Sequence, residues 1–222
     1  MCNLYSLTKG QAAIRDWFRV PHDRTGNLPL FPAIFPDQMA PIIRVGADAE
    51  RELVMARWGM PAPPQFGGAP ITNIRNVKSP HWRGWLGKNR CIVPATSFCE
   101  YEDTKPRKTP KWFALDVERP LFAFAGLWTP WRGIRGPKSA PVEGEHELFG
   151  FLTTEANAVV APIHLKAMPV NVGHVRRLRA KSGRCRTVWP TRPIRLIPAV
   201  PARSGMAGGR QLRPLPSARR NS

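Results

Sequence analysis

The sequence lacks several features that define common protein classes. Its four cysteines, Cys2, Cys91, Cys99 and Cys185, form no C-x-x-C pair, which argues against a zinc site. No apolar run is long enough to span a bilayer, and no basic segment followed by an apolar stretch marks a signal peptide. We therefore expect a cytoplasmic protein with free thiols, because a reducing compartment disfavours disulfides.

Acidic residues are scarce and unevenly distributed. The 222 residues include 34 Lys and Arg against 15 Asp and Glu, a formal net charge of +19, yet no acidic residue follows Glu155. The segment 172–222 holds 13 of the basic residues, so the rest of the chain carries 21 basic and 15 acidic side chains, or +6. The folded part is thus only moderately basic, which suits a phosphate-binding surface.

Apolar alternation predicts a β-rich α+β domain. A hydrophobic content of 42% in 222 residues supports one domain with a substantial core. The stretches IIRV and ELVMARWGM are typical of two strands joined by a polar turn, and RCIVPATSFCEYE is typical of a strand followed by a turn that ends at Glu100. KWFALDV and PLFAFAGLW are expected to pair, and HELFGFLTT to form a further buried strand.

Short helices are expected at three places. Apolar spacing predicts one over residues 8–20 and another over residues 79–86, with Ser79 as the N-cap. Thr154 is expected to cap a third helix that continues to His164. Between the first two, PAPPQFGGAP is too rich in Pro and Gly for regular structure and is predicted to be a surface loop.

The opening stretch MCNLYSL places a cysteine directly after the initiator methionine. Removal of Met1 would leave Cys2 with a free α-amine and a thiol on adjacent carbons, which is a 1,2-aminothiol. The unperturbed amine titrates near ~8 and the thiol near ~8.5, so part of each is nucleophilic at neutral pH. The alternative is that Cys2 is an ordinary small residue at the chain terminus.

Four segments together resemble the SOS response-associated peptidase family: MCNLYS, TNIRN, RCIVPATSFCEY and TTEANAVVAPIHLKAMPV. The resemblance covers about residues 1–170. It implies antiparallel or mixed sheets curled into a barrel-like core, and covalent attachment of the terminal cysteine to abasic sites in single-stranded DNA. No metal or organic cofactor is implied, and association with the bacterial nucleoid is expected when DNA is bound. The oligomeric state is not readable from the sequence, and a monomer is the default expectation.

The resemblance also implies the site residues. Cys2 matches the family nucleophile, Asn73 the asparagine that holds it by hydrogen bonds, Glu100 the catalytic glutamate, and His164 the histidine after the late helix. The alternative interpretations are a turn-forming Asn, a surface Glu and a structural His.

Three further residues match positions where the family contacts DNA. Arg75 and Arg83 match arginines that bind phosphates, although a solvated arginine is the usual alternative. Phe66 matches an aromatic residue that stacks on a base beside the lesion, while Gln65 stands where a second ring would complete the pair.

Residues 172–222 depart from the family pattern. Arg, Pro, Gly and Ser dominate this segment, and the family's closing helix and strand are not recognisable in it. We predict little stable structure here. The segment is either a basic extension of a domain spanning 1–171 or the product of a reading frame shifted near Asn171.

Three functions remain open from the sequence. The first is a DNA-damage response enzyme that forms a thiazolidine between Cys2 and an abasic site. The second is a cysteine peptidase that uses Cys2, Glu100 and His164 and acts either on other proteins or only on its own N-terminus. The third is a non-catalytic binder of single-stranded DNA, for which Arg75 and Arg83 would matter and Cys2 would not.

Overall fold

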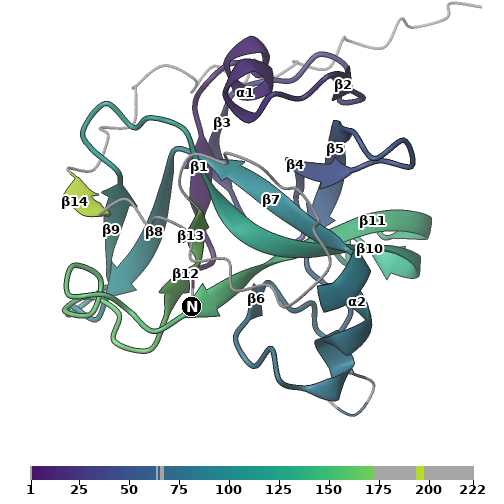
Figure 1. Ribbon diagram of the computed structural model, residues 1–222. Helices are drawn as coiled ribbons and strands as arrows, with labels where there is room; N and C mark the ends of the chain where they lie inside the picture. The colour runs from purple at the N-terminus through teal and green to yellow at the C-terminus, as the bar shows by residue number, and fades with distance from the viewer. Residues whose placement is uncertain (1, 64, 66–67, 173–193, 198–222) are drawn as a thin grey trace, which may run out of the picture.

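A computed structural model describes residues 2–63, 65, 68–172 and 194–197, and these residues form mainly β-strands (Figure 1). The strands are β1 (Tyr5–Leu7), β2 (His22–Asp23), β3 (Phe31–Ile34), β4 (Met39–Val45), β5 (Arg51–Trp58), β6 (Asn73–Ile74), β7 (Arg90–Ala95), β8 (Ser97–Glu102), β9 (Thr109–Ala114), β10 (Phe122–Arg135), β11 (Val142–Thr154), β12 (Met168–Pro169), β13 (Asn171–Val172) and β14 (Arg195–Ile197). The helices are α1 (Gln11–Phe18), the 3₁₀ turn η2 (Pro80–Trp82) and α2 (Arg83–Lys88).

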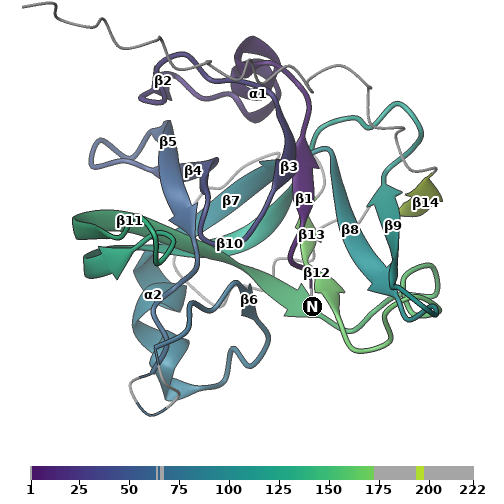
Figure 2. The same ribbon diagram turned by 180° about the vertical axis from the view of Figure 1, so that it is seen from behind.

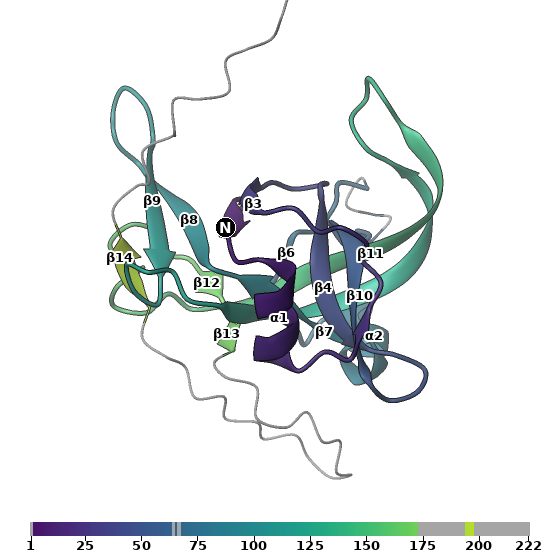
Figure 3. The ribbon, with the colours of Figure 1, turned by 90° about the horizontal axis from the view of Figure 1, so that it is seen from above.

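Two sheets share one core. The smaller has the strand order β14-β9-β8-β1-β3, and the larger runs β12-β11-β10-β7-β4-β5-β2. An additional parallel pairing joins β5 to β11, so that β5, β4, β7, β10 and β11 close into a five-stranded barrel. The predicted β-rich α+β fold with a barrel-like core is confirmed. Figure 3 shows the far end of the β10–β11 hairpin extending away from the rest of the fold.

Aromatic side chains fill the core and fix the start of the chain. Tyr5 of β1 is fully buried and packs edge-on against Trp58, with ring centroids 5.2 Å apart, and against Phe124 at 5.8 Å. Such pairs contribute about 0.5–1.5 kcal/mol each beyond the area they bury. Because Tyr5 is three residues from Cys2, this packing holds the N-terminal segment against the barrel.

The first two predicted helices are present with different bounds: α1 is shorter than the predicted range 8–20, and η2 with α2 covers residues 80–88 in place of 79–86. Helix α1 buries Ile14 and Phe18 and ends at Arg19, whose φ of 51° is left-handed. Ser79 occupies the N-cap position of η2, but its side chain makes no capping hydrogen bond. No helix in the described part of the chain is long and apolar enough to cross a membrane.

The predicted pairing of KWFALDV with PLFAFAGLW is wrong. Strand β9 pairs with β8 and β14, whereas β10 pairs with β7, β11 and β13. The two runs are close in sequence and both apolar, but they belong to different sheets. Glu100, predicted at the end of a turn, lies instead within β8, where its backbone is opposite Lys111 of β9 in the register of the two strands.

The predicted helix from Thr154 to His164 is also wrong. Thr154 ends β11, and the following residues form turns. The Asn157 side chain accepts hydrogen bonds from the backbone amides of Val159 and Val160, which competes with helical hydrogen bonding. Pro162 has no amide to donate to a helical ladder.

Strand β14 was not predicted, because Arg and Pro surround its short apolar run. It pairs with β9 through Arg195 to Ile197, and Ile194 and Ile197 are buried. The rest of the predicted tail, apart from Val172, which ends β13, lies outside the described residues.

Candidate active site

Four segments that are distant in sequence meet near the start of the chain. Strand β1, just after Cys2, pairs with β8, which carries Glu100. Strand β6, which begins at Asn73, pairs with β11, and so does β12, which follows the loop of His164. Figure 2 shows β1 between β3 and β8, in agreement with the strand order. The topology therefore brings the four predicted catalytic residues to one end of the fold.

Cys2 is buried, with 1% of its surface exposed. Its thiol donates a hydrogen bond to the carbonyl oxygen of Leu4, with Sγ 3.4 Å away. Burial, and next the negative charge of Glu100, raise the pKa of the Cys2 thiol well above its ordinary value. The raised pKa favours the protonated form of the thiol at neutral pH.

Asn73 holds the backbone of Cys2. Its Nδ2 lies 2.8 Å from the carbonyl oxygen of Cys2 and donates a hydrogen bond to it. A carbonyl oxygen only accepts, so the amide nitrogen must face Cys2 and the orientation of the Asn73 side chain follows. The predicted contact between Asn73 and the terminal cysteine is thus present in the fold.

Glu100 is a buried carboxyl group, with 2% of its surface exposed. Burial raises the pKa of Glu100 from 4.5 to about 7, because the charged form loses its solvation. A group with this pKa is present in both protonation states at neutral pH, which is what a general acid and base requires.

His164 completes the group. Its Nε2 lies 4.0 Å from Oε2 of Glu100. Burial lowers the pKa of His164 below 6.5, so the imidazole is mainly neutral at pH 7. The ring is carried by a turn in which the His164 amide donates to the carbonyl of Val160, 2.9 Å away.

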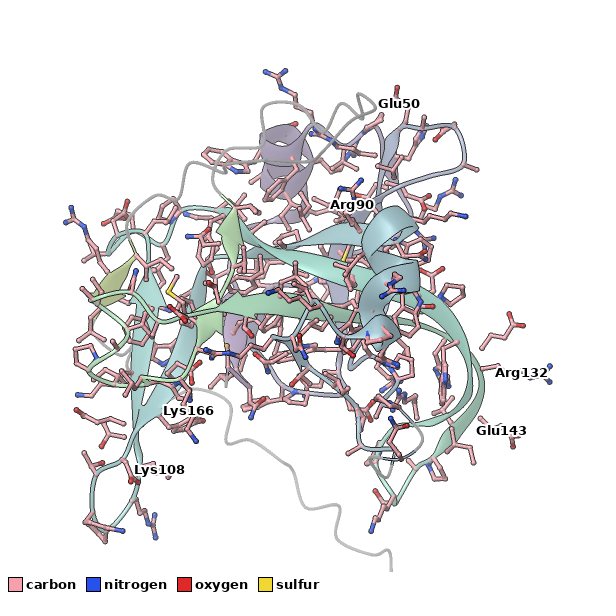
Figure 4. All side chains as sticks on the ribbon, turned by 60° about the horizontal axis from the view of Figure 1, so that its bottom comes forward. Glu50, Arg90, Lys108, Arg132, Glu143 and Lys166 are labelled. Carbon is pink, nitrogen blue, oxygen red and sulfur yellow. The ribbon has the colours of Figure 1, made fainter. Side chains whose placement is uncertain are left out.

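The predicted DNA-contacting arginines lie on the surface. Arg75 is exposed immediately after β6, and Arg83 is exposed at the first position of α2. Lys166, two residues after His164, is also exposed and extends outward from its loop (Figure 4). The predicted stacking residue Phe66 lies outside the described residues, although its neighbour Gln65 is described and exposed.

Thr72 and Asn3, which were not predicted as site residues, extend the hydrogen bonds of Asn73. The Thr72 hydroxyl oxygen accepts a hydrogen bond from Asn73 Nδ2 at 2.8 Å, and it donates to Asn3 Oδ1 at 3.4 Å. Thr72 precedes Asn73 and Asn3 follows Cys2 in the sequence, and this adjacency is the signal that could have indicated a role for them. Within the described ranges, no group of three or more His, Cys, Asp or Glu side chains is arranged to hold a metal ion.

The barrel thus carries a buried cysteine at position 2 within the electrostatic influence of the buried carboxyl group of Glu100, and the imidazole of His164 lies 4.0 Å from that carboxyl group. The profile of the SOS response associated peptidase family matches residues 1–179, so the chain belongs to that family.

Curated relatives match parts of the chain. It is 37% identical over 87 residues to the abasic site processing protein YobE of Bacillus subtilis (strain 168), a match that spans 36% of this chain and 39% of that protein. It is 33% identical over 121 residues to the abasic site processing protein YoqW of the same organism, spanning 51% and 50% of the two chains. The chain thus spans half or less of the length of these two relatives.

Solved structures share the fold. A crystal structure of a protein from Bordetella bronchiseptica has a TM-score of 0.60 and 23% identity, and the match covers 78% of this chain and 84% of that one. One from Bacteroides thetaiotaomicron has a TM-score of 0.57 and 21% identity, with 77% of each chain covered.

Proposed function

We propose that this protein processes abasic sites in single-stranded DNA by forming a thiazolidine between the site and Cys2. The activity is assigned to residues 1–171. The single observation that carries the proposal is the position of Cys2. Asn73 donates a hydrogen bond to its carbonyl oxygen, and the negative charge of Glu100 is close enough to raise the pKa of its thiol. The names of the relatives YobE and YoqW support abasic DNA as the substrate.

The chemistry begins with removal of Met1, which frees the Cys2 amine. An abasic deoxyribose opens to an aldehyde, and the amine adds to its carbonyl carbon. Loss of one water gives an imine. The Cys2 sulfur then forms a bond to the imine carbon, the nitrogen takes up a proton, and a five-membered ring closes. The net reaction joins aldehyde and aminothiol and releases one water.

Glu100 and His164 supply the proton transfers in this scheme. The carboxyl form of Glu100 protonates the sugar ring oxygen as the ring opens, and its carboxylate form takes the thiol proton when sulfur attacks. A pKa of about 7 makes both forms available near neutral pH. His164 Nε2 lies 4.0 Å from Glu100 Oε2, and in this scheme the neutral imidazole orients the sugar on which Glu100 acts.

Surface cations would hold the DNA backbone. Arg75 follows the strand that begins with Asn73, so a phosphate bound there would lie beside the reacting sugar. Arg83 begins α2 and offers a second contact along the strand. The two guanidinium groups suit bidentate contacts with phosphate oxygens.

The test uses a single-stranded oligonucleotide with one abasic site, incubated with the full chain and separated on a denaturing gel. The mature protein should give a shifted band, while Cys2→Ala, Cys2→Ser and a form that retains Met1 should give none. Cys91→Ala is the matched control, since Cys91 is also buried but lies on β7. Circular dichroism of each variant checks folding.

The other outcomes separate the alternatives. If folded mature protein gives no band, the thiazolidine proposal is wrong. Cleavage of a peptide panel that disappears in Cys2→Ala would then identify a cysteine peptidase. DNA binding that depends on Arg75 and Arg83, with neither reaction observed, would identify a non-catalytic binder.

A further inference from the structure

The side-chain amide of Asn73 uses both of its donors. One N–H of Nδ2 is directed to the carbonyl oxygen of Cys2 and the other to the hydroxyl of Thr72, each at 2.8 Å. A single contact would leave the amide plane free to swing about its bond to Cβ. Two acceptors in different directions fix that plane, so the hydrogen bond to Thr72 sets the direction of the amide oxygen, Oδ1.

Thr72 is itself held firmly. Its carbonyl oxygen accepts hydrogen bonds from Trp58 Nε1 at 3.1 Å and from the amide of Phe151 at 3.3 Å. Its hydroxyl donates toward Asn3 Oδ1 at 3.4 Å, which leaves the oxygen lone pairs for Asn73. The three side chains therefore form a directed series from Asn73 to Thr72 to Asn3, and both ends of the series meet the chain at or beside Cys2.

The other end of the Asn73 amide has a spare acceptor. Oδ1 of Asn73 is buried and has no hydrogen-bond partner within the described part of the protein. Buried acceptors are normally satisfied, so this oxygen is available for a donor that comes with processing or with the substrate. Removal of Met1 creates new N–H donors on Cys2, the residue whose carbonyl Asn73 already binds.

We propose that Thr72 is a positioning residue, which fixes Asn73 so that its Oδ1 accepts a hydrogen bond from the amine of mature Cys2. This inference rests on the proposed function, since it concerns the amine that reacts there. Holding the amine by one N–H directs its lone pair and limits its rotation, and such orientation raises the rate of reaction with a bound aldehyde. Thr72 acts through Asn73 and does not touch the reacting atoms.

The test compares Thr72→Val with Thr72→Ser. Valine matches threonine in shape and keeps both backbone hydrogen bonds of residue 72, but it removes the hydroxyl, whereas serine keeps the hydroxyl. With saturating abasic DNA, Thr72→Val should form the crosslink about tenfold more slowly, and Thr72→Ser should restore most of the rate. Binding of intact single-stranded DNA, measured by fluorescence anisotropy, should be the same in all three proteins.

The pH profile provides the readout that a purely structural role would not move. An acceptor at the amine favours its protonated form, so loss of the fixed Oδ1 should lower the amine pKa and shift the acid limb of the rate profile toward lower pH in Thr72→Val. A wild-type rate and profile in folded Thr72→Val, or a Thr72→Ser variant as slow as Thr72→Val, would overturn the proposal.

A small aldehyde separates this inference from the proposed function. Any N-terminal cysteine can condense with formaldehyde, and mass spectrometry detects the gain of the aldehyde less one water. If abasic DNA gives no crosslink but formaldehyde reacts at Cys2 with the same dependence on residue 72, the function fails and the positioning role stands. If both reactions occur and neither depends on residue 72, the positioning role fails alone.

Discussion

Replacement of Glu100 by Gln should change how the stability of the protein depends on pH. The carboxyl group is buried, and burial raises its pKa from 4.5 to about 7. In the unfolded chain the same group ionises near ~4.5. Between these two values the folded protein binds more protons than the unfolded chain does, so the free energy of unfolding falls as pH rises through that window.

The size of the effect follows from the same values. The difference between 4.5 and about 7 corresponds to roughly 3 kcal/mol, which wild type loses between about pH 4 and pH 8. Glutamine does not titrate, so Glu100→Gln lacks this loss. The variant should therefore gain stability relative to wild type by up to roughly 3 kcal/mol across the same window, even if the two differ at pH 4.

Urea titrations followed by tryptophan fluorescence at several pH values measure this difference directly. Glu102→Gln is the matched control, since Glu102 lies on the same strand but is partly exposed and pairs with Lys111 at 3.2 Å. Such a pair contributes at most ~1 kcal/mol. Parallel stability curves for wild type and Glu100→Gln from pH 4 to 8 would refute the argument that burial controls this carboxyl group.

Three other variants test separate parts of the structure. Asn157→Ala removes two hydrogen bonds to backbone amides in the turn before His164 and should cost about 1–3 kcal/mol, seen as a lower urea midpoint. Asn171→Leu should stabilise the protein by about 1–3 kcal/mol, because this amide is buried with no hydrogen-bond partner among the described residues; a lower midpoint would contradict this. Arg75→Ala and Arg83→Ala should each reduce the slope of log affinity against log salt for single-stranded DNA by ~0.7, and an unchanged slope would place the phosphates elsewhere.

Local patterns predicted the elements that local interactions form. The hairpin of β4 and β5 followed from two apolar runs and a polar turn, and the two strands do pair from Met39 to Val45. The helix behind the N-terminus followed from apolar spacing and buries Ile14 and Phe18. In both cases the residues that decide the structure are neighbours in sequence.

Pairing between distant strands could not be predicted in the same way. Closure of the barrel depends on contacts of Arg57 and Trp58 with Leu148 and Phe149, about 90 residues further along the chain, and no local pattern encodes that choice of partner.

The error in the predicted helix before His164 has a local cause instead. Its apolar spacing favours a helix. In the fold, however, the amides of Val159 and Val160 donate to the side chain of Asn157, whereas a helix that began at Thr154 would direct them to the carbonyls four residues earlier.

The identities of the site residues came from the resemblance, whereas their reactivity depends on burial that only the fold supplies. From the sequence, the amine and thiol of Cys2 are similarly nucleophilic near neutral pH. In the fold, burial raises the pKa of the thiol while bringing the pKa of Glu100 to about 7. In the proposed reaction the amine is therefore the group that attacks first, and ring closure requires Glu100 to be ionised when sulfur reacts. Ring opening needs the same carboxyl group protonated, so the alkaline limb of the rate profile should follow the ionisation of Glu100 while the acid limb follows the Cys2 amine, and Glu100→Gln should slow the reaction by about 100-fold or more.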